Sequence, residues 1–252
     1  MRISLPFHQH IYQSDLSKGI DISIPLIPGS DSPKCFFAPS FNVEPVKSGD
    51  FIGEISAGSP VNFRNIFINP HGNGTHTECV GHITAEPYTI NQCLTEFHFI
   101  ASLITVMPLH TETGDHIITE KILYEKLKDR EETPVVIIRT LPNDTGKRSK
   151  DYSGTNPPYF TEDAIKYLNK RQVKQLMTDL PSIDREEDGG KLTAHKMFWM
   201  WPSIPDIQKT ITEMVFIENA VEDGLYLCNI QIISIESDAS PSKIIIYPLN
   251  II

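Results

Sequence analysis

The chain has 252 residues, of which 40% are hydrophobic and 21% are charged, and its formal net charge is −10. A chain of this length and composition can bury a sizeable core, and we expect residues 1–252 to form a single globular domain. The acidic balance leaves no basic surface that could neutralise phosphates, so nucleic acid is not an expected partner. The sequence also lacks the apolar run of a signal peptide or a membrane span, which favours a cytoplasmic protein.

The first half of the chain predicts short strands joined by turns. Residues 20–24 alternate isoleucine with polar residues, which is the period of a strand, and Pro25 and Gly29 end this pattern. Residues 30–60 are rich in Pro, Ser and Gly and predict a long ordered loop or a pair of short edge strands. Residues 62–70 form another strand candidate, and they lead directly into a segment rich in histidine.

The second half predicts a mixture of strands and helices. We expect helices at residues 119–132 and 161–176, and strands at residues 99–109, 133–140, 214–220, 225–236 and 242–249. Residues 133–140, TPVVIIRT, contain a continuous β-branched run, as in a strand that is buried on both faces, and Thr161 is a suitable N-cap. Because strands and helices do not alternate strictly, the sequence predicts an α/β fold with a mixed β-sheet core flanked by helices.

Residues 71–82, HGNGTHTECVGH, hold three of the nine histidines, although a window of this length is expected to hold fewer than one. His76, Glu78 and His82 have the same parity, so an extended backbone would place them on one face. A helix beginning near Glu78 would instead make Glu78 and His82 neighbours. Either geometry brings imidazole and carboxylate together, which suits zinc or another divalent transition metal.

Two features of this segment leave alternatives open. His71 is out of phase by one residue, and the glycines at 72 and 74 could absorb the extra residue as a bulge. The segment could also be a turn whose histidines are solvated or bonded locally, although their density favours a ligand motif. Cys79 has the opposite parity, and we expect it to be a reduced, buried thiol, as are the scattered cysteines at 35, 93 and 228.

The segment resembles the metal motif of the cyclase family of metal-dependent hydrolases, which includes bacterial kynurenine formamidase and isatin hydrolase. The family motif is His-x-Gly-Thr-His-x-Asp-x-Pro-x-His, and this chain has Gly-Thr-His at 74–76 and the last histidine at His82. Three positions depart from the motif. Glu78 replaces the aspartate, Val80 replaces the proline, and the first histidine, His71, comes one residue early.

Further blocks similar to the family pattern follow in the same order between about residue 20 and residue 248. They read GIDISIPL, VVIIRT, FTEDAIKYL, TDLPSID, LTAHKMF, VFIENA and DASPSKIII. Of these, LTAHKMF supplies His195 and VFIENA supplies Glu218, at the places where the family has its distal metal ligands.

The resemblance implies a swivelling β/β/α-like fold and a homodimer or homotetramer. It also implies one or two divalent ions, Zn²⁺ or Mn²⁺, held by His71, His76, Glu78, His82, His195 and Glu218. Glu78 would bridge two ions, and His82 would be either a ligand or the catalytic acid/base. If His71 does not reach the first ion, that site would lose a ligand and the second site would remain.

The implied activity is hydrolysis of a small amide or cyclic amide, in which a metal-bound hydroxide attacks the carbonyl. An arylformamide such as N-formylkynurenine is the best-known substrate class. Two alternatives are a non-catalytic or metal-deficient small-molecule-binding descendant of the family, and a lyase or cyclase acting on a polyketide-like substrate.

Asp179, Ser182 and Asp184 fit turn and capping roles better than the lining of a cleft. Phe198 and Trp199 would form either core packing or an aromatic wall for a planar substrate.

Overall fold

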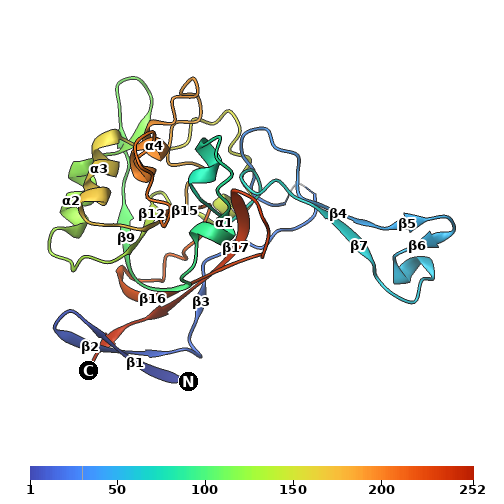
Figure 1. Ribbon diagram of the computed structural model, residues 1–252, viewed down its shortest axis with the longest axis horizontal. Helices are drawn as coiled ribbons and strands as arrows, with labels where there is room; N and C mark the ends of the chain where they lie inside the picture. Colours follow the sequence, from blue (N-terminus) through green and yellow to red (C-terminus); the bar gives the residue numbers. More distant parts are fainter. Residues whose placement is uncertain (30) are drawn as a thin grey trace.

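Seven strands close into a mixed β-barrel at the centre of the computed structural model, which describes residues 1–29 and 31–252 (Figure 1). In order around the barrel they are β16 (Gly224–Ile232), β9 (His98–Val106), β12 (Val135–Thr140), β14 (Gln175–Thr178), β15 (Thr210–Glu213), β8 (His76–Glu78) and β17 (Ala239–Pro248). Pairing of β16 with β17 closes the ring, and β3 (Ile20–Asp21) pairs with β17 as an eighth strand. Strands β9, β12, β14 and β15 run parallel and the other pairs antiparallel, so the prediction of a mixed sheet is confirmed.

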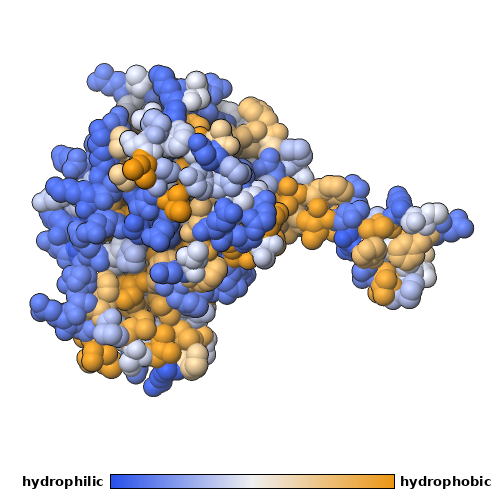
Figure 2. All heavy atoms as spheres, in the orientation of Figure 1, coloured by the Kyte–Doolittle hydropathy of each residue, from blue (hydrophilic) through white to orange (hydrophobic). Residues whose placement is uncertain are grey.

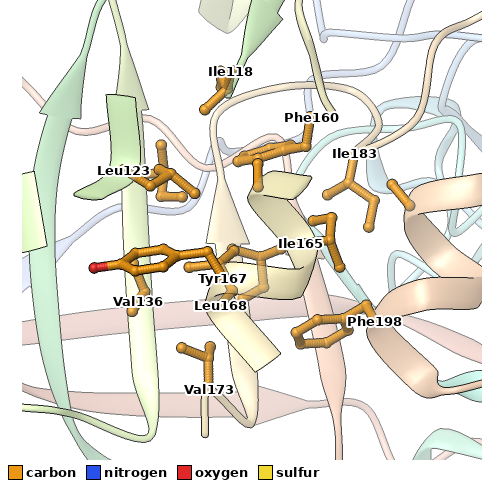
Figure 3. Close-up of a cluster of buried hydrophobic side chains, with 14 of the residues drawn as sticks. Ile118, Leu123, Val136, Phe160, Ile165, Tyr167, Leu168, Val173, Ile183 and Phe198 are labelled. Carbon is orange, nitrogen blue, oxygen red and sulfur yellow. The ribbon is translucent and has the colours of Figure 1, made fainter. Parts of the chain in front are cut away.

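Strand β12 is buried on both faces, which accounts for its run of β-branched apolar residues. All six of its residues are buried, and the side chains of the first four alternate between two hydrophobic clusters. Val136 and Ile138 belong to the cluster beneath the helices, whereas Val135 and Ile137 belong to the other cluster. Figure 3 shows Val136 beside the helical side chains of the first cluster. Each face of the strand therefore packs against apolar groups.

Three helices pack on one another and on this side of the barrel. They are α2 (Glu120–Leu127), α3 (Glu162–Lys170) and α4 (Thr193–Trp199). The remaining helix, α1 (Ile90–Cys93), is a single turn and is not part of this group. Ile165, Leu168 and Phe198 point into the shared cluster (Figure 3). Phe198 and Trp199 are fully buried, so their role is core packing.

Helix α3 is shorter than the sequence suggested. It begins after Thr161, as predicted, with Glu162 and Asp163 in its first turn, but it ends at Lys170 rather than near residue 176. Gln172 has a left-handed backbone with φ of 57°, which turns the chain out of the helix. The following residues pair with β12 as the parallel strand β14, because sheet pairing outweighs local helix propensity.

Two strand predictions were displaced. The strand expected at 214–220 lies earlier, as β15 at Thr210–Glu213, and residues 214–220 form a loop. In the predicted strand 20–24, β3 includes residues 20 and 21, although Ile22 and Ile24 remain buried. The strands expected near 99–109, 225–236 and 242–249 correspond to β9, β16 and β17.

An arm projects from the barrel and contains the edge strands predicted for the region 30–60, of which residue 30 lies outside the described part (Figure 1). It consists of β4 (Asn42–Pro45), β5 (Lys47–Ser48), β6 (Phe51–Ile52), the 3₁₀ turn η1 (Ile55–Ala57) and β7 (Arg64–Phe67). Strand β7 confirms the strand candidate at 62–70. The arm exposes apolar side chains, among them Phe63 and Ile66. Figure 2 shows apolar surface along the arm.

The remaining elements lie at the periphery. A small sheet joins the two ends of the chain through β1 (Arg2–Phe7), β2 (His10–Asp15) and β18 (Asn250–Ile251). A second small sheet contains β10 (Leu109–His110), β11 (His116–Ile118) and β13 (Tyr159–Phe160). Two 3₁₀ turns, η2 (Val80–Ile83) and η3 (Thr145–Arg148), lie in connecting segments. All four cysteines are free and buried, as predicted. Among the described residues, none of the helices has the length and apolar character needed to span a membrane.

Gly81, in η2, allows the histidine-rich segment to pack closely against the loop that contains Tyr88. A Cβ atom at this position would lie 2.1 Å from the backbone oxygen of Tyr88. We expect Gly81→Ala to lower the free energy of unfolding by about 1–3 kcal/mol, because backbone must move to relieve the overlap. Urea unfolding measures this change. Gly224→Ala is the control, since its Cβ would meet its nearest atom at 3.9 Å, and equal stability of the two variants would contradict the argument.

Candidate metal centre

The barrel register brings distant acidic and imidazole groups to the short strand β8. Glu213 lies opposite His76 because β15 pairs with one edge of β8, and Ala239 lies opposite Glu78 because β17 pairs with the other edge. His76 and Glu78 are two residues apart on an extended strand and therefore share a face. The chain then enters η2, which carries His82, so the segment is extended at its start and turned at its end.

The carboxylate of Glu78 lies at the centre of the cluster and is almost completely buried. Its Oε1 is 3.0 Å from Nε2 of His195, and its Oε2 is 2.9 Å from Nδ1 of His71 and 3.9 Å from Nε2 of His82. Burial raises the pKa of this carboxyl, but the adjacent His82, His195 and His71 outweigh burial and hold the pKa well below its usual range. Glu78 is therefore an ionised carboxylate inside the protein.

His71 reaches this carboxylate despite its early position in the sequence. Gly74, between His71 and β8, has a φ of 66°, a left-handed conformation that glycine adopts readily. The ring of His71 stacks on His82 with centroids 4.1 Å apart, and its Nε2 is 2.8 Å from Oδ2 of Asp238. Burial lowers the pKa of His71, but hydrogen bonds to Asp238 and Glu78 outweigh it and raise the pKa to about 10.

Helix α4 supplies His195 in a fixed orientation. Asp184 accepts hydrogen bonds from the backbone amides of Ala194 and His195 at the start of the helix, and from Nδ1 of His195 at 2.6 Å. Burial lowers the pKa of His195, but Asp184 and Glu78 outweigh it and raise the pKa to about 10. A carboxylate behind a ligating imidazole is the usual arrangement that orients the ring toward a metal ion. Asp184 thus combines capping with positioning.

His76 carries the unpartnered polar atom of the cluster. Its side chain is fully buried, and Nδ1 donates to the backbone oxygen of Gly74 at 3.0 Å. This bond leaves Nε2 as the nitrogen with a lone pair, and Nε2 has no hydrogen-bond partner, although Oε2 of Glu213 lies 3.4 Å away. A buried polar atom without a partner is costly, and a divalent cation would satisfy both this lone pair and the adjacent carboxylate.

The residues present fit a divalent transition metal. Three overlapping groups of possible ligands have their ligand atoms within 4.8 Å of one another. The groups are His71 with His76 and Glu78, His71 with His82 and Asp238, and Glu78 with His82 and His195. Imidazole nitrogens combined with carboxylate oxygens are the donor set preferred by zinc and related ions.

The structure does not bring Glu218 to the cluster, so its assignment as a ligand needs correction. Its side chain is 55% exposed and lies 3.6 Å from Arg148. The cause is the displaced strand, because β15 ends at Glu213 and places that buried carboxylate beside His76 and His195. Thr-Ile-Thr-Glu at 210–213 alternates as a strand does, and this was the signal that could have found Glu213.

Asp238 is a second acidic residue that the sequence did not single out. It lies immediately before β17, and its Oδ2 is 2.8 Å from Nε2 of His71 and 3.5 Å from Nδ1 of His82. Hydrogen bonds from these two histidines hold the pKa of Asp238 well below its usual range. Asp179, by contrast, bonds Thr140 and Lys147 away from the cluster and has a structural role.

The chain is similar to a known protein family and to several solved structures. Residues 14–185 match the model of a protein family described as "Putative cyclase". A predicted metal-dependent hydrolase from Bacillus stearothermophilus has 18% identity and a TM-score of 0.61, with 91% of this chain and 98% of that chain covered. Isatin hydrolase A from Labrenzia aggregata has 15% identity and a TM-score of 0.65, with coverage of 91% and 93%.

A further solved structure, isatin hydrolase A from Ralstonia solanacearum, has 15% identity and a TM-score of 0.66, with 91% of each chain covered. At these identities the structural likeness shows a shared fold. Among curated proteins, none matches the chain.

Glu213 and Glu218 form a matched pair for testing the assignment of ligands. We expect Glu213→Gln to weaken zinc or manganese binding by about tenfold or more, because it removes a buried negative charge beside His76 and His195. Glu218→Gln should bind metal as the wild type does, since Glu218 lies outside the cluster. Equilibrium dialysis with elemental analysis measures both. Weak binding by Glu218→Gln with normal binding by Glu213→Gln would contradict the geometry.

Metal uptake should release protons. With protein groups alone around them, both ring nitrogens of His71 and of His195 face carboxylates, and each pKa is about 10. Both rings are therefore protonated at pH 7, and each must lose a proton before its nitrogen can bind an ion, so about two protons should leave per site filled. Affinity should consequently rise as the pH rises from 6 toward 8. Calorimetry in two buffers of different ionisation enthalpy counts the protons, and identical heats in both would contradict this expectation.

Proposed function

Because the chain belongs to the cyclase family, we propose that it is a metal-dependent hydrolase of a small amide or cyclic amide. The observation that carries this proposal is the buried carboxylate of Glu78 among His71, His82 and His195, with the unpartnered Nε2 of His76 beside it. The described hydrolases of the same fold support a hydrolytic reaction. We propose Zn²⁺ or Mn²⁺ as the ion and an arylformamide such as N-formylkynurenine as the first substrate class to test.

The residues divide into those that would hold an ion and those that would handle protons. His76, Glu78 and His195 are buried and His71 is partly buried, and Glu213 and Asp238 add carboxylates on two sides. A divalent ion bound among them would polarise a carbonyl oxygen and make water a nucleophile at neutral pH. The surrounding core excludes bulk water from this side of the cluster, which strengthens its electrostatic interactions.

His82 is the residue best placed to move a proton. Its ring is 29% exposed, whereas His76 and His195 are buried, so His82 lies where the cluster meets solvent. The ring of His71 is 24% exposed, but both of its nitrogens lie within 3.0 Å of carboxylates. Asp238 lies 3.5 Å from its Nδ1 and orients the ring, and Nε2 is then the atom that takes a proton from water or gives one to a leaving nitrogen. The position of His82 in η2, rather than on β8, accounts for this partial exposure.

The early position of His71 in the sequence does not keep its ring away from the cluster. The interpretation as a non-catalytic binding protein depended on this early position, which was expected to cost the first site a ligand. In the structure the ring of His71 contacts both Glu78 and Asp238 within 3.0 Å. The presence of His71 at the cluster supports the hydrolase over the binding protein.

A substrate panel tests the proposed reaction. We expect the protein loaded with zinc or manganese to hydrolyse at least one arylformamide or cyclic amide in a panel that also contains lactones, and to lose this activity after removal of the metal. Restoration by added metal excludes damage during removal. If metal-loaded protein turns over no arylformamide or cyclic amide of the panel, the proposed reaction is wrong.

The same assay assigns the role of His82. We expect His82→Ala to lower kcat by roughly 10²–10⁴-fold while metal content stays near that of the wild type, as for loss of a general acid/base. His110→Ala is the control, because His110 lies on β10 and contacts His116 rather than the cluster. Loss of metal with little change in the kcat of the loaded fraction would make His82 a ligand instead.

A further inference from the structure

A second site lies on the opposite side of helix α4 from the metal cluster. A cavity of about 750 Å³ opens between α3, α4 and the segment that follows α4. Its volume is within the range of small-molecule sites, roughly 300–1,000 Å³. None of the residues of the metal cluster lines it.

The faces of α4 separate the two sites. Thr193, Lys196 and Met197 line the cavity, and their spacing of three and four residues places them on one face of the helix. His195 is two residues from Thr193 and one from Lys196, so at 3.6 residues per turn it projects from the other face. A ligand in the cavity would thus contact the helix that carries His195 without touching the metal cluster.

The cavity is strongly basic in a chain whose net charge is −10. Five lysines line it: Lys166, Lys174, Lys191, Lys196 and Lys209. Lys166 pairs with Glu162, and Lys174 lies 2.6 Å from Asp206. Within residues 1–29 and 31–252, the other three have no carboxylate within 4.0 Å. The positive charge that remains is available to an anion.

Lys209 is the most unusual of these cations because it is only 4% exposed. Its Nζ donates to Oδ1 of Asn169 at 2.6 Å and to the backbone oxygen of Phe198 at 3.1 Å, and it lies 4.8 Å from the centre of the Phe198 ring. An ammonium has three protons, so one remains for another acceptor. Burial lowers the pKa of Lys209 to about 8, which shows the cost of holding this charge without a carboxylate.

The rest of the lining is apolar. Met197, Met200 and Trp201 form an apolar wall of the cavity beside the lysines. Methionine side chains adapt to ligands of different shape, and an indole ring offers a flat face for an aromatic group. The combination of a cationic end and an apolar wall favours a ligand with an acidic group and an apolar body.

We propose that this cavity binds a small organic anion, whose acidic group pairs with Lys191, Lys196 and Lys209 and whose apolar body packs on Met197 and Trp201. Carboxylates and phosphates share the chemistry that these lysines recognise. The site is independent of the proposed hydrolytic function, because it uses none of the residues of the metal cluster.

Calorimetric titration with three probes tests the proposal. Benzoate and phenyl phosphate have the acidic group and the apolar body, and they distinguish a carboxylate site from a phosphate site, whereas benzyl alcohol is the neutral control. We expect at least one of the two anions to bind about tenfold or more tightly than benzyl alcohol, since charge-assisted hydrogen bonds hold it. Equal binding of benzyl alcohol, or no binding of either anion, would overturn the proposal.

Variants and metal removal locate the bound anion. Lys209→Met, and separately the surface double variant Lys191→Gln with Lys196→Gln, should each weaken binding about tenfold. Lys121→Gln on α2 removes one positive charge elsewhere, as Lys209→Met does in the cavity, and should leave binding unchanged. The double variant keeps the test valid if Lys209→Met fails to fold. Binding should persist after metal is removed. Wild-type binding by the double variant, or binding that disappears with the metal, would overturn the proposal.

Discussion

The burial of the Glu78 carboxylate is the constraint on which the rest of the site depends. An ionised carboxylate inside a protein is costly unless opposite charge or hydrogen-bond donors surround it. Here imidazoles from three parts of the chain provide them: His71 from the loop before β8, His82 from the turn after it, and His195 from α4. Two protonated imidazoles and one divalent ion carry the same charge, so the cluster can exchange one for the other without a change in net charge.

The barrel supplies these groups through its register rather than through proximity in sequence. Strand β8 has three residues, and pairing on both of its edges places Glu213 on one side and Asp238 on the other. Asp184 ties the start of α4 to the imidazole of His195. The same helix forms one wall of the lysine-rich cavity, so one short element takes part in both sites that we propose.

Much of the fold and most of the cluster could be predicted where the signal is local. The density of histidine in residues 71–82, the β-branched run of β12 and the start of α3 each depend on neighbouring residues. The alternation at 210–213 could have identified Glu213 as a strand residue. Its place in the cluster, and that of Asp238, depend on how β8 pairs with β15 and β17 and could not be found in this way. Because β15 lies a few residues earlier than expected, Glu213 takes the place in the cluster that the sequence assigned to Glu218.

Metal content per chain tests the central claim most directly. Elemental analysis of protein purified without chelators, and again after loading with zinc or manganese, should find one or two tightly bound ions per chain, as the nitrogen and oxygen donors around Glu78 favour. His76→Ala should lose tight binding, because it removes the buried nitrogen that has no other partner. Wild-type protein without bound metal after loading, or His76→Ala with unchanged metal content, would contradict the account.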